Sequence, residues 1–392
     1  MTMKRVLYLT HYAELYGANR SLLDLIITLR EQGRIEPLVV LAADGPFRSI
    51  LQKHDIAHVV IPFQTWMHKR VFSGGPHHRL LQRMRFRRAA RERDRSARQA
   101  SVAIETFARK RQVELVHTNS SVIGIGGVVA RALGVPHVWH IRELPFLHYG
   151  FSVDGGVRRY AQELRQAQGI IALSQAVVSD MRTLLPLDIP VHVIPNGICS
   201  ENALPAQRVG AVNAGFDFLL AALFHPSKGQ ELAVRAFAKV HGEEKNTTLH
   251  LVGGGRSDAV RKLVDELGLQ KAVVFHGFVD DISELLGNAD CVLQCSKHEA
   301  LGRIVLEAMA AGIPVIGHAS GATPELVEHG VTGLLFTTQD ELATHMLTMV
   351  YDRERGMAMG ENARARIPTE FTLEVMAART WKVYQEVLLQ GQ

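Results

Sequence analysis

Short apolar segments alternate with longer segments of helical spacing along most of the chain. The first apolar segment covers residues 6–10, and spacing typical of a helix follows from Ser21. The same order recurs with an apolar segment from Phe216 and a predicted helix from Glu231. Further strands are predicted at 38–41, 115–118, 137–140, 169–173, 191–194, 248–252, 273–276, 291–295 and 315–316. This alternation predicts an α/β fold with parallel sheets, in which ligands bind beyond the carboxyl ends of the strands.

The pattern divides the chain into two halves near residues 195–197, where Pro and Gly end a predicted strand. A chain of 392 residues is too long for one ordinary core and suits two domains of similar size. We expect a first domain over 1–197 and a second over 198–368, with an irregular linker at 201–215. Apolar residues at helical spacing predict a final helix within 369–392.

The composition is that of a soluble globular protein, with 47% hydrophobic and 21% charged residues. The N-terminal residues do not resemble a secretory signal, and no apolar run reaches the roughly 20 residues that span a bilayer. Three cysteines lack metal-ligand spacing, and an odd number fits a reducing compartment. We therefore expect a cytoplasmic protein.

The net charge of +5 is unevenly distributed. Residues 69–111 contain fourteen basic and three acidic residues, so this basic segment carries +11 and the remainder carries 5 − 11 = −6. Such a segment can attract an anionic membrane surface, which would place the protein peripherally on the inner face of the plasma membrane. A solvated helix stays open as the simpler interpretation. Nucleic acid is not expected, because few aromatic residues such as Phe86 are interleaved with the basic ones and no reader motif is present.

Two glutamates with seven residues between them provide the clearest candidate chemistry. Glu299 follows a predicted strand, and Glu307 lies in a segment of small residues with helical character. The amides at a helix N-terminus can bind phosphate without a metal. Carboxylates accept hydrogen bonds from hydroxyls, so Glu299 could bind a sugar and Glu307 a ribose on either side of a diphosphate.

Residues 296–336, which contain this pair, resemble the donor-site signature of retaining glycosyltransferases of family 4, which have the GT-B fold. Other segments agree in order: GANRSLLDLI from Gly17, HIRE from His140, VIPNGI from Val193, PSKG from Pro226, HLVGGG from His250 and FHGFV from Phe275. The resemblance implies two Rossmann-like, doubly wound parallel-sheet domains with a cleft between them. The first would bind the acceptor and the second the nucleotide sugar, and the last helix would cross back to the first domain.

The resemblance also assigns donor-binding residues. Gly302, Arg303 and Ile304 would supply amides to the phosphates, Lys228 would add a cation, Phe278 would lie at the nucleobase, Glu307 would hold the ribose and Glu299 would contact the donor sugar. The chain departs from the family at Leu223, where an arginine usually stands. Arg303 is our first candidate to replace that missing cation.

In the first domain, His140 resembles the family's catalytic-region histidine, and we expect its ring to project into the cleft. Arg142 and Glu143 beside it are candidate acceptor contacts. Gly17 and Asn19 resemble the family's flexible glycine loop. Asn119 is a further cleft candidate, although an Asx turn explains it equally well.

The sequence contains no pair of aspartates two residues apart, so the metal-binding motif of the other major glycosyltransferase fold is absent. We expect neither a metal nor a cofactor. The predicted activity is retaining transfer of a sugar to a hydroxyl of a carbohydrate or lipid-linked acceptor, in bacterial polysaccharide or glycolipid assembly. Two alternatives stay open: a non-catalytic nucleotide-sugar-binding subunit, which Leu223 would favour, and another GT-B activity such as a nucleotide-sugar epimerase.

Overall fold

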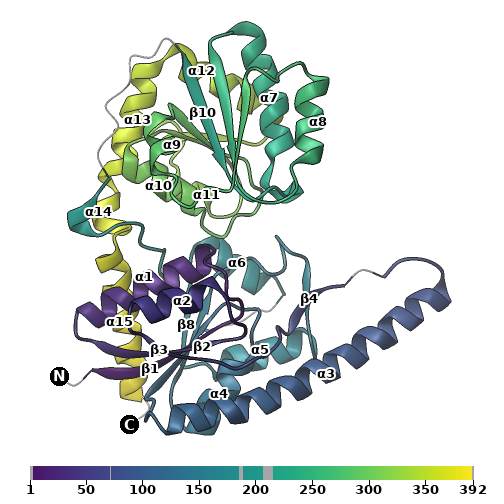
Figure 1. The fold of residues 1–392 in the computed structure, drawn as a ribbon, viewed down its shortest axis with the longest axis vertical. Helices are drawn as coiled ribbons and strands as arrows, with labels where there is room; N and C mark the ends of the chain where they lie inside the picture. Colours follow the sequence, from purple (N-terminus) through teal and green to yellow (C-terminus); the bar gives the residue numbers. More distant parts are fainter. Residues whose placement is uncertain (1–2, 71, 185–188, 206–214, 391–392) are drawn as a thin grey trace. The chain divides into compact units, whose positions relative to one another are not determined.

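A computed structural model describes residues 3–70, 72–184, 189–205 and 215–390. The chain forms two compact units, which we describe separately (Figure 1). Unit 1 contains residues 1–197 together with 373–392, and unit 2 contains residues 198–372. Each unit has its own central parallel sheet, so the predicted α/β fold with two Rossmann-like units is confirmed.

Unit 1 is built on a seven-stranded sheet with strand order β3-β2-β1-β5-β6-β8-β9, in which all neighbours are parallel. Its strands are β1 (Lys4–Thr10), β2 (Ile35–Leu41), β3 (Ala57–Val60), β5 (Leu115–Asn119), β6 (His137–Ile141), β8 (Gly169–Ala172) and β9 (His192–Val193). A separate antiparallel pair joins β4 (Met67–Lys69) to β7 (Phe151–Val153). Because β1, β5, β6 and β8 are buried, their apolar segments were visible in the sequence.

The helices of unit 1 cover this sheet and include the last helix of the chain. They are α1 (Gly17–Glu31), α2 (Pro46–Lys53), α3 (Pro76–Arg109), α4 (Ile125–Leu133), α5 (Val157–Gln166), α6 (Gln175–Leu184) and α15 (Leu373–Gln390). Val383, Tyr384 and Val387 of α15 pack in one apolar cluster with Val138 of β6 and Leu22 of α1. The last helix therefore contributes to the core of the first unit rather than the second.

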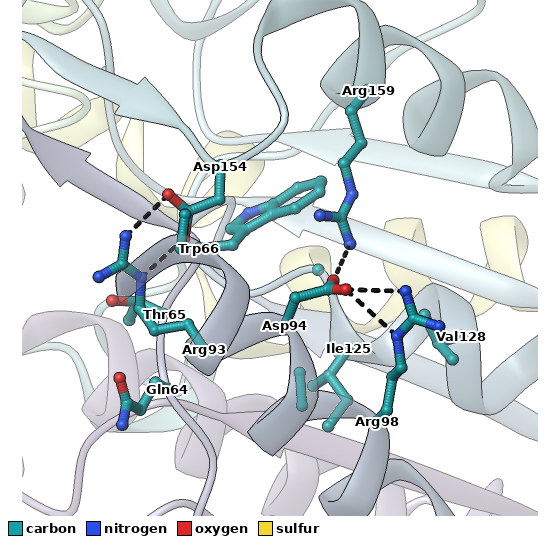
Figure 2. Close-up of a pocket in the computed structure, with 13 residues that line it drawn as sticks. Gln64, Thr65, Trp66, Arg93, Asp94, Arg98, Ile125, Val128, Asp154 and Arg159 are labelled. Atoms are coloured by element: carbon teal, nitrogen blue, oxygen red, sulfur yellow. Dashed lines mark hydrogen bonds and ion pairs between the residues drawn. The ribbon is translucent and has the colours of Figure 1, made fainter. Parts of the chain in front are cut away.

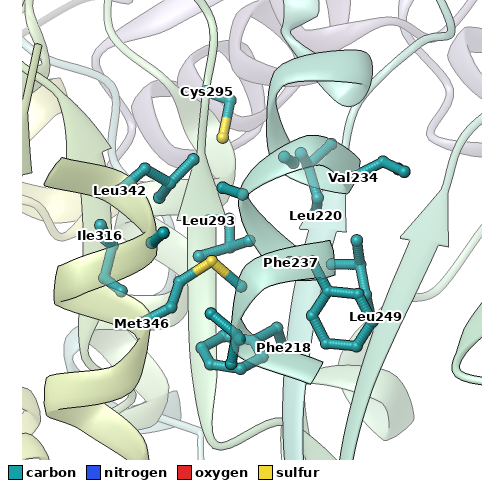
Figure 3. Packing of buried hydrophobic residues seen from close by; sticks show 14 of the residues in the cluster. Phe218, Leu220, Val234, Phe237, Leu249, Leu293, Cys295, Ile316, Leu342 and Met346 are labelled. Carbon is teal, nitrogen blue, oxygen red and sulfur yellow. The ribbon is translucent and has the colours of Figure 1, made fainter. Parts of the chain in front are cut away.

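Unit 2 has a six-stranded parallel sheet of order β12-β11-β10-β13-β14-β15. Its strands are β10 (Phe216–Ala221), β11 (Thr247–Val252), β12 (Val273–Gly277), β13 (Cys291–Gln294), β14 (Val315–His318) and β15 (Gly333–Phe336). Its helices are η1 (Glu201–Ala203), η2 (Pro226–Lys228), α7 (Gln230–Glu243), α8 (Asp258–Glu266), α9 (Ser283–Asn288), α10 (Arg303–Ala311), α11 (Thr323–Leu326), α12 (Gln339–Tyr351), α13 (Arg353–Ala365) and α14 (Ile367–Glu370). Figure 3 shows Phe218, Phe237 and Met346 packed in its core.

Several elements differ from the sequence-based expectation. Helix α1 begins at Gly17 instead of Ser21, and β15 was not predicted because Gly-Leu-Leu-Phe lacks the β-branched residues that favour strands. Most of the expected linker, at 206–214, lies outside the described residues. The basic segment 69–111 contains one helix of 34 residues, α3.

Candidate active site

The carboxyl end of β10 in unit 2 leads into the short helix η2, which carries Lys228. Gly229 follows with φ +73°, and a Cβ there would lie 2.8 Å from the Cβ of Cys295. Only glycine permits this close approach of the backbone to the end of β13. The turn thus brings Lys228 beside the segment that follows β13.

Glu299 lies on that segment and pairs directly with Lys228. The Lys228 Nζ donates to Glu299 Oε2 across 2.8 Å, and both side chains are mostly buried. The Glu299 carbonyl accepts a hydrogen bond of 2.8 Å from the amide of Ala322. The backbone of Glu299 is therefore held by the loop that follows β14, and its side chain is held by Lys228.

Helix α10 begins directly after this segment. Its N-cap residue Gly302 has φ +87°, and a Cβ there would lie 2.9 Å from Gln294 Nε2. Residues that carry a side chain rarely adopt this backbone conformation, so glycine is required where the chain enters the helix. Arg303, the first residue of α10, donates through Nε to Oε1 of Glu307, one turn later, across 2.9 Å. The helix N-terminus, which favours anions, is therefore flanked by two cation–carboxylate pairs.

Leu223 and Phe278 lie on either side of the glycine turn after β11. Both side chains are exposed, at 55% and 65% of their surface. A Cβ on Gly254 would lie 3.8 Å from Phe278 Cβ and 4.0 Å from Leu223 Cδ1. Two exposed apolar side chains thus gather where the family usually has a cation. Ile304 is buried, so its side chain belongs to the core, and only its backbone amide in the first turn of α10 is a candidate for donor binding.

The ring of His140, which we expect from the sequence to project into the cleft, is buried within unit 1. Only 1% of the residue is exposed, and its ring lies 5.4 Å from that of His117. Alternation along β6 places His140 on the same face as Val138, which α15 covers, and Tyr384 of α15 hydrogen-bonds His117 Nδ1 across 2.7 Å. Burial, with the nearby Arg142 charge, holds the pKa of both histidines well below the usual range.

Arg142 occupies the centre of a buried polar cluster. It donates to the side-chain oxygens of Asn119 and of Asn196, the latter across 2.7 Å, and it lies 3.4 Å from His140 Nδ1. Because a guanidinium only donates, His140 Nδ1 acts as the acceptor and the neutral ring carries its proton on Nε2. Burial lowers the pKa of Arg142 to about 10. Asn196 was missed, although its place directly after a predicted strand was the available signal.

Glu143 and Asn19 organise loops. Glu143 Oε1 accepts hydrogen bonds from the hydroxyl of Ser120 and from the amide and hydroxyl of Ser121, both at 2.9 Å. Asn19 is buried, and its Nδ2 donates to the carbonyls of Tyr12 and Glu14 across 2.9 and 2.8 Å. Gly17 begins α1 with open space around its Cα. These contacts fix the loops that follow β1 and β5 at the carboxyl edge of the sheet.

A cavity of about 250 Å³ lies elsewhere in unit 1, between α3 and the start of α4 (Figure 2). Trp66, Ile125 and Val128 line its apolar side, while Arg93, Asp94, Arg98, Asp154 and Arg159 supply the charged side. None of the site residues predicted from the sequence lines it. Across the described residues, no three His, Cys, Asp or Glu side chains are grouped so that they could hold a metal ion.

Two family models match the chain: the model described as Glycosyltransferase Family 4 over residues 16–202, and that described as Glycosyl transferases group 1 over residues 209–366. The Anabaena protein Alr3699/HepE, solved in complex with UDP and glucose, is 25% identical and superposes with a TM-score of 0.78 over 98% of this chain and 99% of that one. WaaG, a glycosyltransferase of lipopolysaccharide biosynthesis, shares the fold, with 18% identity and a TM-score of 0.66 over 97% and 99% of the two chains.

Curated relatives are also glycosyltransferases. The N-acetyl-alpha-D-glucosaminyl L-malate synthase of Bacillus anthracis is 35% identical over 42% of this chain, and the match spans 44% of that relative's length, which is less than half. Alpha-maltose-1-phosphate synthase of Mycobacterium tuberculosis is 29% identical over 70% of this chain and 79% of its own. Alpha-monoglucosyldiacylglycerol synthase of Streptococcus pneumoniae is 26% identical, over 74% and 70% respectively. Two family models that together match nearly the whole chain, and a fold shared along its length, show that the protein belongs to glycosyltransferase family 4 with the GT-B fold.

Proposed function

We propose that the protein transfers a sugar from a nucleoside-diphosphate donor to an acceptor hydroxyl with retention of anomeric configuration. The observation that carries this proposal is the pairing of Lys228 with Glu299 and of Arg303 with Glu307 around the N-terminus of α10. Cations and amides suit a diphosphate, and the two carboxylates suit the hydroxyls on either side of it. The UDP and glucose bound by the Anabaena relative are ligands of this kind.

The proposed chemistry begins with departure of the diphosphate from the anomeric carbon of the sugar. Lys228, the amides of Gly302, Arg303 and Ile304, and the α10 dipole stabilise the charge that builds on the leaving oxygen. The acceptor oxygen bonds to the anomeric carbon on the same face, and its proton passes to the leaving phosphate. Glu299 positions the donor sugar, Glu307 holds the ribose, and the exposed ring of Phe278 lies at the nucleobase.

Unit 1 would bind the acceptor and complete the catalytic set. His140 is the candidate catalytic residue, acting as a neutral hydrogen-bond donor through Nε2, because its pKa is held well below 6.5 by burial. Arg142 and Asn119 position that ring and are candidate acceptor contacts. Gly17, Asn19 and Glu143 shape the surrounding loops. Neither a metal nor a cofactor takes part in the proposed reaction.

We also propose a place in the cell for this activity, in bacterial glycolipid or polysaccharide assembly. One relative is named as a synthase of a glucosyldiacylglycerol, which has a lipid acceptor. No described helix is long and apolar enough to cross a membrane. The basic segment 69–111 would instead hold a cytoplasmic protein on an anionic surface, where a lipid-linked acceptor lies.

Leu223 favours a second candidate, a binding subunit that holds a nucleotide sugar without transferring it. Because an exposed leucine stands in place of the usual arginine, one of the cations that would stabilise the leaving diphosphate is missing. Such a subunit would bind nucleotide but release none from a nucleotide sugar.

Thermal shift with UDP, GDP, ADP and dTDP identifies the nucleotide, since a ligand that binds only the folded state raises the melting temperature. Release of that nucleotide from its sugar conjugate, with and without acceptor, then separates the two candidates. Retention is checked by the anomeric configuration of the product. If none of the four nucleotides shifts the melting temperature, the donor site is wrongly assigned.

A further inference from the structure

The N-terminal half of α3 projects from unit 1 as a helical arm. In Figure 1 this half extends beyond the sheet and the other helices of the unit. The arm, residues 76–91, carries six arginines and no acidic residue. The proposed function depends only on the total charge of the basic segment, not on the shape or the apolar residues of this arm.

One side of the arm contacts the segment that precedes it. Arg79 Nε donates to the Gly74 carbonyl across 2.7 Å, the Gln82 side chain accepts from the Ser73 amide across 3.0 Å, and the Phe86 ring lies 6.2 Å from that of Phe72. At about 100° per residue, Arg79, Gln82 and Phe86 share one face of the helix. Among the described residues, these three contacts all lie on one face of the arm, which we call the inner face.

The opposite face carries three large apolar side chains. Leu80, Leu81 and Met84 are 56%, 54% and 60% exposed. They fall within an arc of about 100°, roughly opposite the inner face. Arg83 and Arg85 flank this arc, and Arg87, Arg88 and Arg91 follow it one to two turns later. An apolar face bounded by cations is the pattern of a helix that lies in a membrane interface.

Ion pairs at its root hold the arm in place. Arg93 donates through Nε and Nη2 to both oxygens of the buried Asp154 across 2.7 and 2.9 Å (Figure 2). The next residue, Asp94, accepts from Arg159 across 2.8 Å. Two neighbouring residues of α3, Arg93 and Asp94, are thus bound by other parts of unit 1. These ion pairs fix the orientation of the arm, and of its apolar face, relative to the sheet of unit 1.

We propose that residues 76–91 form an interfacial helix that inserts Leu80, Leu81 and Met84 between the lipids of an anionic membrane, with the arginines that flank this face at the headgroups. A second copy of the arm is a poor partner, because each arm carries six positive charges and no negative one. Nucleic acid would engage the arginines but would leave the three apolar side chains in water. The inference rests on the proposed membrane location and adds to it the residues that enter the bilayer.

Vesicle flotation with phosphatidylglycerol-containing membranes at about 0.1 M and about 1 M salt tests the insertion, since the screening length falls from about 10 to about 3 Å. Wild type should keep part of its binding at high salt. Each large apolar side chain removed from the membrane should lower the partition coefficient by about tenfold. The variant Leu80→Ser/Leu81→Ser/Met84→Ser should therefore bind vesicles at least about 100-fold more weakly than wild type. Val102→Ser, which alters a 63% exposed side chain on the body half of α3, is the matched control and should bind as wild type does.

A second measurement reports depth. Met84→Trp should shift its emission to the blue on vesicle binding and be quenched by lipids brominated in the acyl chain. Replacing Arg83, Arg85, Arg87, Arg88 and Arg91 by Gln should abolish the salt-sensitive part of the binding. Nucleotide thermal shift, measured on every variant, should be unchanged, so a failure of the donor site would be visible independently of vesicles.

Three results would overturn the proposal. The first is equal vesicle binding by wild type and the triple serine variant. The second is full competition by double-stranded DNA at equal phosphate concentration, which would make the arm a general polyanion site. The third is a dimer of wild type that the triple serine variant abolishes, which would assign the face to a second copy.

Discussion

Replacing Glu299 by Gln should strengthen the binding of a nucleoside diphosphate while weakening transfer. Glu299 accepts from Lys228 Nζ across 2.8 Å, so the carboxylate occupies the cation that the proposal gives to the diphosphate. A glutamine of the same size removes the negative charge and keeps an oxygen for the donor sugar. The two functions of the site should therefore change in opposite directions.

The size of the effect follows from the burial of the pair. The Lys228 and Glu299 side chains are 21% and 20% exposed, so their interaction lies between the values for water and for a dry interior. Unit charges at 4 Å interact by about 1 kcal/mol in water and about 4 kcal/mol at an effective dielectric of 20. Because desolvation offsets much of this attraction in a mostly buried pair, we expect a net gain of about 1 kcal/mol, or about fivefold tighter nucleotide binding. Loss of the carboxylate that positions the donor sugar should lower kcat about 100-fold.

Isothermal calorimetry with the nucleotide selected by thermal shift, and steady-state transfer with its sugar conjugate, measure the two effects. Asp340→Asn is the matched control, since Asp340 forms another carboxylate–lysine pair, with Lys239 on α7, and is largely exposed. That variant should change neither quantity. Weaker nucleotide binding by Glu299→Gln would refute the reasoning, because the carboxylate would then contribute to nucleotide binding directly.

Four further predictions follow from the site. Glu307→Ala should lose about 1 to 3 kcal/mol of nucleotide affinity, because ribose hydroxyls are left unpaired; an unchanged affinity in the folded variant would contradict this. His140→Ala should lower kcat far more than donor affinity, and near-normal turnover would remove His140 from the catalytic set. Activity should survive EDTA, and a requirement for Mg²⁺ or Mn²⁺ would show that the donor site is misread. The free energy of unfolding should fall between pH 6.5 and pH 5, because burial lowers the pKa of His117, His140 and His137 and only the unfolded chain takes up protons there. Each histidine contributes at most about 1.4 kcal/mol per pH unit. A urea midpoint that does not change over this range would contradict the burial of these histidines.

Much of the fold could be predicted because buried parallel strands are apolar along their whole length. The segments 6–10 and 169–173 belong to strands with neighbours on both sides, β1 and β8, and were found from their side chains alone. The short strands β4 and β7 were not predicted, because each has three residues and pairs only with the other. Their pairing depends on contacts that lie more than eighty residues apart in the sequence, which no local pattern encodes.

The site was predictable in part for the same reason. Lys228 and Glu299 are distant in sequence, but each follows a strand, and the ends of the neighbouring strands β10 and β13 meet at one edge of the sheet. The direct ion pair could not be predicted, since it depends on side-chain conformations. The burial of His140 could not be predicted either, because the sequence gives the face shared with Val138 but does not say that α15 covers it.

The charges at the donor edge give Leu223 a physical meaning. Lys228 and Arg303 each pair with a carboxylate, so these four side chains sum to zero before any ligand binds. An arginine at position 223 would make the sum +1, whereas leucine leaves a diphosphate to be stabilised by exchange of partners and by the N-terminus of α10. Binding should then require that both glutamates find hydroxyls when they release their cations, which a nucleotide sugar provides and inorganic pyrophosphate does not. We therefore expect the missing arginine to make the site selective for the complete donor over pyrophosphate. A Leu223→Arg variant should bind pyrophosphate more tightly while gaining less for the nucleotide sugar.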